Sequence, residues 1–305
     1  MGKLSPMDER AILIAGPTAS GKSSLALRLA EEAVVKGRQP VIVNADSMQV
    51  YRELRVVTAR PGEAEEATYR HALYGFASGA ETFSTGRWLD EIAAVFRELR
   101  DNDLPIIVGG TGLYFKALIE GFATIPPIPD VVRTRLRYEL NEHGAAKMHR
   151  ILRRVDPLAA AEIKAGDGHR ILRALEVKEV TDKSILWWQA QAQAAPLLSS
   201  RDCRKLIALP ERDLLYDRIN RRFEMMVGEG ALAEVDALVA LHLDPALPIM
   251  KAIGVPQLAA HLHGDLSLDE AVADAQQESR RYAKRQMTWS RNQMGDDWER
   301  VERIS

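Results

Sequence analysis

The sequence predicts an α/β fold in which a parallel sheet is flanked by helices and an all-helical segment is inserted into the chain. Two observations predict the sheet. The first 120 residues alternate short apolar runs with amphipathic stretches, and a glycine-rich loop joins the first apolar run to the first helical stretch. A third observation predicts the insertion: residues 130–194 have helical periodicity throughout and contain no apolar run typical of a strand.

Four short apolar runs have the length and composition of buried strands. They are residues 11–15, 40–44, 105–108 and 205–209. Amphipathic stretches between and after these runs predict helices that cover the sheet. They are residues 22–36, 87–102 and 214–227, with further helices up to about residue 292.

A proline-rich stretch separates the first part of the chain from the helical segment. Pro126, Pro127 and Pro129 cannot lie inside a helix or a central strand, so this stretch is expected to be a stiff connector. We therefore expect a discontinuous core domain formed by residues 1–124 and 200–305. Residues 125–199 are expected to form a helical insertion domain.

The most specific motif is ILIAGPTASGKS, residues 12–23, which fits G-x-x-x-x-G-K-[ST] between a strand and a helix. In such a loop backbone N–H groups surround phosphate oxygens, the lysine reaches the terminal phosphates and the last hydroxyl coordinates Mg²⁺. The alternative is a glycine turn that binds nothing. The motif makes the expected core P-loop NTPase-like, with a bound di- or triphosphate. The expected diphosphate-binding residues are Gly16, Pro17, Thr18, Ala19, Ser20, Gly21, Lys22 and Ser23, and Ser23 is the expected Mg²⁺ ligand.

Polar residues follow the next two strands, and the carboxyl ends of parallel strands are where ligands bind. Asp46 and Ser47 follow the second strand, and the Asp46 carboxylate can act as a general base or hold Mg²⁺ through water. The alternative is that both residues cap a helix. The third strand ends in Gly109, Gly110 and Thr111 without the acid of an ordinary ATPase, and the Thr111 hydroxyl can donate to a phosphate oxygen.

The net charge of −2 is distributed unevenly along the chain. Residues 131–155 are rich in arginine and lysine, and a second basic run lies at residues 280–291. Basic helices in a nearly neutral protein suit a bound polyanion, although each run alone is equally well explained as a solvated helix face.

The cysteine content and the lengths of the apolar stretches indicate the compartment in which the protein is expected to act. Cys203 is the single cysteine, which excludes a disulfide framework, fits a reducing compartment and is expected to be a small core residue. No apolar stretch approaches the length of a membrane span, and residues 11–15 are too short for a signal peptide core. A lone histidine, His71, lies in an apparent loop and is expected to be structural. We expect a cytoplasmic protein.

Eight blocks of the sequence, in their order, resemble the tRNA dimethylallyltransferases, enzymes that prenylate adenosine 37 beside the anticodon. The blocks are GPTASGKS, ADSMQVY, TARP, GGTGLYFKAL, the DP…HRILRALEV region, RINRRFEMM, AIGVPQ and AKRQMTW, and they extend over about residues 11–292. Three positions depart from the common pattern of that family. Arg60 replaces a lysine, HALYGF replaces HHLID, and Pro256 replaces an arginine.

The resemblance implies transfer of a dimethylallyl group from dimethylallyl diphosphate to N6 of adenosine 37, with release of diphosphate. It implies Asp46, Thr111 and Arg222 as catalytic residues, with Asp46 taking the N6 proton and Arg222 and Thr111 stabilising the leaving group. It also implies Mg²⁺ on Ser23, with Asp46 able to reach the ion through water. The implied tRNA-binding residues are Asp46, Ser47, Met48, Gln49, Thr111, Arg133, His169, Arg170, Ile171, Leu172, Arg173, Ala252, Ile253, Gly254, Val255, Pro256 and Gln257.

Two other functions are compatible with a phosphate loop. A small-molecule kinase using ATP is disfavoured by the missing acid after the third strand and by the large basic insertion. A non-enzymatic RNA-binding switch is disfavoured by Asp46 and Thr111, which lie where a reaction centre is expected. The expected partners are the anticodon stem-loop of tRNA and dimethylallyl diphosphate, with no membrane, and the enzyme is expected to be a monomer. The sequence does not decide between dimethylallyl diphosphate and a nucleotide-linked prenyl donor.

Overall fold

The computed structural model describes residues 9–191 and 195–302 of the chain. The chain divides into two compact units. One contains residues 1–119 and 198–305, and the other contains residues 120–197.

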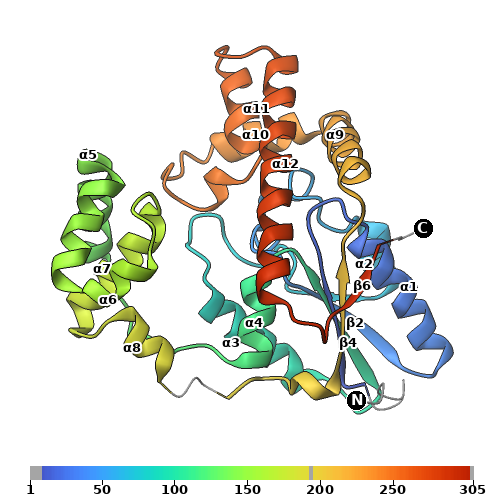
Figure 1. Cartoon of the computed structure of the whole chain (residues 1–305). Helices are drawn as coiled ribbons and strands as arrows, with labels where there is room; N and C mark the ends of the chain where they lie inside the picture. Colours follow the sequence, from blue (N-terminus) through green and yellow to red (C-terminus); the bar gives the residue numbers. More distant parts are fainter. Residues whose placement is uncertain (1–8, 192–194, 303–305) are drawn as a thin grey trace. The chain divides into compact units, whose positions relative to one another are not determined.

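The first unit is built on a parallel sheet that has six strands in the part of the chain that the structure describes, in the order β3-β2-β4-β1-β5-β6 (Figure 1). The strands are β1 Ala11–Ala15, β2 Gln39–Asn44, β3 Arg70–Ala72, β4 Asp103–Gly109, β5 Cys203–Ala208 and β6 Glu299–Val301. Leu13 of β1 is opposite Ile107 of β4 on one side and Lys205 of β5 on the other. The strand before the phosphate loop is therefore central, and its carboxyl end lies beside that of β4. The predicted α/β class with a P-loop-like parallel sheet is confirmed.

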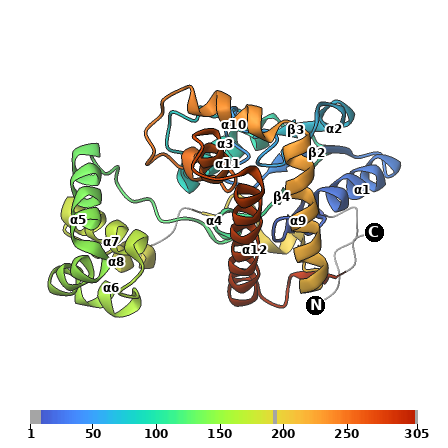
Figure 2. The same cartoon turned by 90° about the horizontal axis from the view of Figure 1, so that it is seen from above.

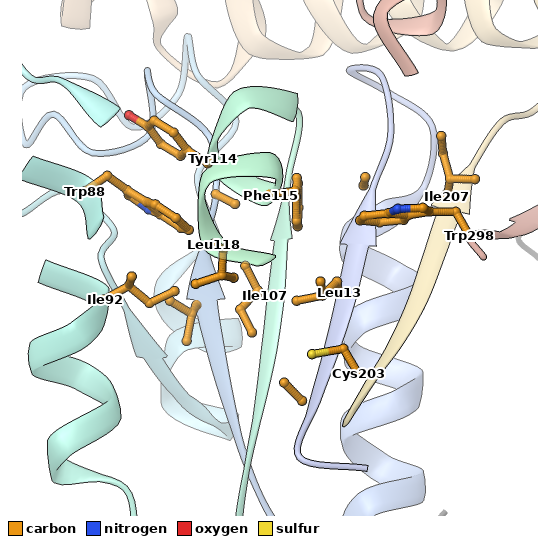
Figure 3. Close-up of a cluster of buried hydrophobic side chains, with 14 of the residues drawn as sticks. Leu13, Trp88, Ile92, Ile107, Tyr114, Phe115, Leu118, Cys203, Ile207 and Trp298 are labelled. Atoms are coloured by element: carbon orange, nitrogen blue, oxygen red, sulfur yellow. The ribbon is translucent and has the colours of Figure 1, made fainter. Parts of the chain in front are cut away.

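Helices cover both faces of this sheet because successive strand residues point to opposite faces. Ile14 of β1 and Ile106 of β4 pack with α1 on one face. Leu13 and Ile107 face the other way and pack with α3 and α4 (Figure 3). The helices of this unit are α1 Lys22–Val35, α2 Glu63–Thr68, α3 Thr85–Glu98, α4 Gly112–Glu120, α9 Arg212–Gly228, α10 Ala231–Val239, α11 Val255–Leu262 and α12 Leu268–Gln293, with the 3-10 turns η1 Ser200–Asp202 and η2 Ile249–Lys251.

A second hydrophobic core lies beyond the carboxyl ends of the strands. It joins α9, α10, α11 and the start of α12 to the loop that follows β2, through residues such as Val57, Phe223, Val235 and Val255. Helices α9 and α12 also contact each other, since Arg280 donates to the Asn220 side chain at 2.5 Å (Figure 2). This core fixes the helices that carry Arg222 and Gln286.

The second unit contains the helices α5 Asp130–Val155, α6 Pro157–Glu162, α7 Gly168–Thr181 and α8 Ile185–Ala190. Its own core includes Leu136, Met148, Leu152 and Ile171. Helix α5 is interrupted at Gly144, whose φ of 73° is not helical. The proline-rich residues 121–129 form neither helix nor strand.

Some sequence-based boundaries were wrong. The strands β3 and β6 were missed, and His71, placed in a loop, pairs with Ile42 as part of β3. Both strands are three residues long, which is too short for a periodic signal. The helix predicted at residues 87–102 covers Thr85–Glu98, because the Ser84 hydroxyl caps its start and Leu99 adopts an extended conformation at its end.

The prediction for the single cysteine is confirmed. Cys203 begins β5, lies in the sheet core, and burial raises the pKa of its thiol to about 11. No helix within residues 9–191 and 195–302 has the length and apolar character needed to span a membrane.

Candidate active site

The loops after β1, β2 and β4 meet at one edge of the sheet. The Ser47 N–H donates to the Thr111 hydroxyl oxygen at 2.9 Å, and the Thr111 N–H donates to the Ala45 carbonyl at 3.1 Å. The Thr111 oxygen thus accepts a hydrogen bond from the neighbouring loop, which leaves its hydroxyl hydrogen available to a ligand.

The loop after β4 needs glycine at two positions, because neighbouring atoms lie too close to leave room for a side chain. A Cβ on Gly109 would lie 2.1 Å from the Ala45 carbonyl oxygen, and one on Gly112 would lie 2.1 Å from the Trp289 ring. Gly112 also begins α4. The motif is therefore a strand–glycine–helix turn packed tightly against its neighbours, with Thr111 held in the middle.

The phosphate loop has the backbone conformation of an anion-binding turn. Ala19 and Gly21 have positive φ values of 59° and 88°, and α1 starts at Lys22 without a side-chain cap or an acidic residue in its first turn. The Ser20 hydroxyl is buried and has no hydrogen-bond partner among the described residues. Free N–H groups at a helix start and an unpaired hydroxyl suit phosphate oxygens. These observations fit the predicted diphosphate site.

Lys22 folds back over this loop, and its Nζ donates to the Pro17 carbonyl at 3.2 Å. Burial lowers the pKa of Lys22 to about 8, the Asp46 carboxylate opposes the shift, and the Arg222 guanidinium adds to it. Burial also lowers the pKa of Arg222, again against the effect of Asp46. The three side chains therefore lie within electrostatic reach of one another.

Asp46 is held in a turn and does not start a helix. Its N–H donates to the Asn44 side-chain oxygen at 2.8 Å, and its Oδ1 accepts from the Met48 N–H at 3.0 Å. The alternative that Asp46 and Ser47 form a helix N-cap is thus wrong. The second carboxylate oxygen, Oδ2, lies over Gly110, 3.3 Å from where a Cβ on that glycine would be, and accepts no hydrogen bond from the described residues.

Three tyrosine side chains lie within electrostatic reach of the Asp46 carboxylate. Burial and the negative charge of Asp46 raise the pKa values of Tyr74, Tyr114 and Tyr282 well above the usual range. Tyr114 also stacks on Trp88 with a centroid separation of 4.4 Å, and both rings are labelled in Figure 3. The negative charge of Asp46 therefore acts on these buried phenols as well as on Lys22 and Arg222.

The donor set fits Mg²⁺ held mainly by substrate. Ser23 is exposed at the start of α1. No group of three or more His, Cys, Asp or Glu side chains that could hold a metal ion is found in residues 9–191 and 195–302. Mg²⁺ commonly keeps several waters and binds one or two protein oxygens plus phosphate oxygens, so a Ser23 hydroxyl beside a diphosphate suits this ion.

Gln286 of α12 is a site residue that the sequence reasoning missed. Its Oε1 accepts from the Thr18 N–H and its Nε2 donates to the Gly110 carbonyl, both at 2.9 Å. Gln286 is 8% exposed, and its amide ties the phosphate loop to the loop after β4. Gln286 lies in the AKRQMTW block, which the sequence analysis singled out. Its role could not be predicted because its partner Thr18 lies 268 positions away in the sequence.

We expect Gln286→Ala to reduce kcat/KM for the predicted diphosphate substrate by about 10- to 100-fold, because both loops lose a common anchor. Steady-state kinetics at saturating acceptor checks this expectation. Gln293→Ala is the matched control, since its side chain accepts from Lys116 at the exposed end of the same helix. Equal kinetics of the two variants would make Gln286 a packing residue only.

The predicted RNA-contacting residues differ in how accessible their side chains are. Ile171, Ala252 and Val255 lie in hydrophobic cores, so their side chains are not accessible to RNA and we withdraw them as side-chain contacts. Gly254 and Gln257 form the cap of α11, where the Gly254 N–H donates to Gln257 Oε1 at 2.9 Å. The residues with side chains that are at least partly exposed are Asp46, Ser47, Met48, Gln49, Thr111, Arg133, His169, Arg170, Leu172, Arg173, Ile253, Pro256 and Gln257.

Sequence comparison identifies relatives along nearly the whole chain. The IPP transferase family model matches residues 49–293. The tRNA dimethylallyltransferase of Allorhizobium ampelinum is 52% identical over 293 residues, which cover 96% of this chain and 94% of that protein. The tRNA dimethylallyltransferase of Bartonella henselae is 48% identical over 286 residues, which cover 94% and 96%.

Solved structures agree with these relatives. The full-length tRNA isopentenylpyrophosphate transferase of Bacillus halodurans superposes with a TM-score of 0.66 at 32% identity, covering 96% of this chain and 90% of that chain. A eukaryotic dimethylallyltransferase acting on tRNA has a TM-score of 0.76 at 24% identity, covering 92% and 70%, and shows a shared fold. The chain is therefore an enzyme of the IPP transferase family.

Proposed function

We propose that the enzyme transfers the dimethylallyl group of dimethylallyl diphosphate to N6 of adenosine 37 in the anticodon loop of tRNA and releases diphosphate. One observation carries this proposal: hydrogen bonds of Gln286 and Thr111 tie the phosphate loop, the loop after β4 and the turn that holds Asp46 together at one edge of the sheet. A base for the acceptor and cations for the leaving group are thus brought to one place.

The leaving diphosphate gains negative charge as its bond to the allylic carbon breaks. The phosphate loop, Lys22 and Arg222 are suited to stabilise this charge, and the Thr111 hydroxyl can donate to a phosphate oxygen. Mg²⁺ held at Ser23, when bound, would neutralise part of the same charge. We favour dimethylallyl diphosphate over ATP in a kinase reaction, because β4 ends in glycines and not in a Mg²⁺-binding acid.

The charge of Lys22 gives a pH dependence with a defined sign. Its pKa of about 8 means that the side chain is protonated at pH 7 and loses its charge as the pH rises through 8. We expect kcat/KM for the diphosphate substrate to fall above about pH 8, since this parameter reports groups of the free enzyme. A pH profile of kcat/KM at saturating tRNA tests this. A profile that is flat from pH 7 to 10 would contradict it.

The acceptor side requires an adenine that has left its stack. An anticodon-loop base has no pairing partner, so exposing it costs less than flipping a base out of a duplex. Asp46 Oδ2 then takes the N6 proton as the new C–N bond forms. We also propose that the enzyme is a monomer and that it acts in the cytoplasm. The single free cysteine and the tRNA substrate favour the cytoplasm.

We propose that the helical unit contacts tRNA phosphates through α5. Arg133 and Arg137 lie one turn apart on this helix. Arg137 forms no ion pair with any described residue, and Arg133 forms a long, exposed ion pair with Asp130 at 3.6 Å. Arg135 lies on the same helix, but its guanidinium binds Glu139 at 2.6 Å and Glu179 at 2.5 Å. Arg137 and the weakly paired Arg133 are thus available to phosphate, whereas Arg135 is already neutralised by two carboxylates.

The double variant Arg133→Ala/Arg137→Ala is expected to bind tRNA with a weaker salt dependence. Each lost phosphate contact lowers the slope of log K against log salt by about one unit, so the slope should fall by about two units. Filter binding over a series of salt concentrations measures it. Arg135→Ala is the matched control and should leave the slope close to that of the unmodified enzyme. An unchanged slope in the double variant would place the tRNA elsewhere.

The proposed reaction is tested with radiolabelled dimethylallyl diphosphate and three acceptors. These are an anticodon stem-loop, the same RNA annealed to its complement, and free adenosine monophosphate. We expect label in the stem-loop alone. Equal labelling of the duplex would contradict the flipping step, labelling of the nucleotide would identify a different acceptor, and no labelling of any acceptor would contradict prenyl transfer.

A further inference from the structure

Glu234 of α10 makes an unusual set of contacts outside the candidate active site. Its carboxylate accepts three consecutive backbone N–H groups, from Arg55 at 2.5 Å, Val56 at 2.8 Å and Val57 at 2.8 Å. One side chain thus fixes three successive peptide groups of the loop after β2. A carboxylate holding three N–H groups is a strong local restraint, because hydrogen bonds to a charged group are shorter and stronger than neutral ones.

The same turn is also restrained at its other end, through the backbone carbonyls of Thr58 and Ala59. Gln49 Nε2 donates to the carbonyls of Thr58 at 2.9 Å and Ala59 at 3.0 Å. Ala59 has a φ of 52°, a conformation that an alanine rarely adopts. Its carbonyl also accepts from Arg222 Nη2 at 3.5 Å. The turn at residues 55–59 therefore connects Glu234 at one end with Arg222 at the other.

Packing supports the same connection. A Cβ on Gly254 would lie 3.0 Å from Val57 and 3.1 Å from Phe223, so both side chains pack against this glycine. Phe223 is the residue next to Arg222 on α9, and Val57 is one of the residues whose N–H binds Glu234. The turn and the helix that carries Arg222 thus belong to one core, and a shift of the turn is transmitted to that helix.

We propose that Glu234 is a positioning residue for Arg222. By fixing the N–H groups of residues 55–57 it holds the Ala59 carbonyl in place. This carbonyl accepts from the half-buried Arg222 guanidinium at 3.5 Å and so limits the positions that this guanidinium can take. The inference rests on the proposed function, which assigns Arg222 to the leaving group. Glu234 itself touches neither the phosphate loop nor Asp46 in the described contacts.

The test compares Glu234→Gln in two backgrounds. In the otherwise unchanged enzyme the substitution should lower kcat/KM for dimethylallyl diphosphate about 10- to 100-fold, with the Kd for tRNA within about twofold. In the Arg222→Ala background the same substitution should change kcat/KM by less than about twofold, because residues that act through one another are non-additive. Thermal unfolding of every variant separates folding from function. Glu234→Asp keeps the charge and should retain more activity than Glu234→Gln. If Glu234→Gln does not fold, Glu234→Asp is compared in the same two backgrounds, and its smaller loss of kcat/KM should again disappear in the Arg222→Ala background.

Glu53→Gln is the matched control, since Glu53 also accepts a backbone N–H, that of Gly79 at 2.9 Å, without a described link to Arg222. Its kcat/KM should be unchanged. Equal losses from Glu234→Gln in the two backgrounds, or equal kinetics of Glu234→Gln and Glu53→Gln, would overturn the inference alone. A fully active Arg222→Ala enzyme would overturn the diphosphate role of Arg222 and the inference with it.

Discussion

Lys22→Ala is expected to lose about 10²- to 10³-fold in kcat, because it removes a charge that stabilises the leaving diphosphate. The Lys22 Nζ contacts the loop only at the Pro17 carbonyl, so its loss removes little that holds the fold together. The thermal unfolding midpoint should therefore stay close to that of the unmodified enzyme. Single-turnover kinetics at saturating tRNA and dimethylallyl diphosphate measure the effect on the chemical step.

Lys36→Ala is the control for this variant. Lys36 caps the opposite end of α1 and is exposed, so it tests the removal of a lysine from the same helix without touching the phosphate loop. Its kcat should be unchanged. A loss of less than tenfold in Lys22→Ala would mean that the phosphate loop does not hold the leaving group, and the diphosphate site would have to be sought elsewhere in the molecule.

The sequence predicts the parts of the site that depend on local signals. The apolar run at residues 11–15 matches β1, and the phosphate motif begins α1 at Lys22 as expected. These features follow from short-range rules on apolar patterning, glycine conformation and helix starts. The positions of Asp46 and Thr111 at adjacent strand ends also follow, because parallel strands place their carboxyl ends at one edge.

Long-range partners could not be predicted in the same way. Gln286 reaches Thr18, and Glu234 reaches the turn at residues 55–57, only after α10 and α12 have packed on the second core. No local pattern encodes those pairings. The strand β6 forms only because β5 offers it a partner, and Glu179 of α7 neutralises Arg135 of α5 only after both helices pack. Charge runs read from sequence thus overestimate the cations free to bind RNA.

Asp46→Asn is expected to lower kcat by about 10²- to 10⁴-fold, the range typical of a lost general base. The substitution preserves shape and local structure, because an asparagine oxygen can still accept the Met48 N–H that now binds Oδ1 at 3.0 Å. What it removes is the basic Oδ2, which accepts no hydrogen bond from the described residues. The tRNA affinity should change little, since one neutral replacement alters one contact among many.

Asp244→Asn separates loss of the base from loss of the turn. Asp244 Oδ1 accepts the N–H of Ala246 at 2.8 Å, the same two-residue spacing that Asp46 has with Met48, but in an exposed loop after α10. An asparagine there should be silent in both stability and kcat. If Asp46→Asn is equally silent, the carboxylate only shapes the turn and another group takes the N6 proton. If kcat falls while the Kd values for tRNA and dimethylallyl diphosphate hold, the loss lies in the chemical step, where the proton must leave N6 for the new carbon–nitrogen bond to persist.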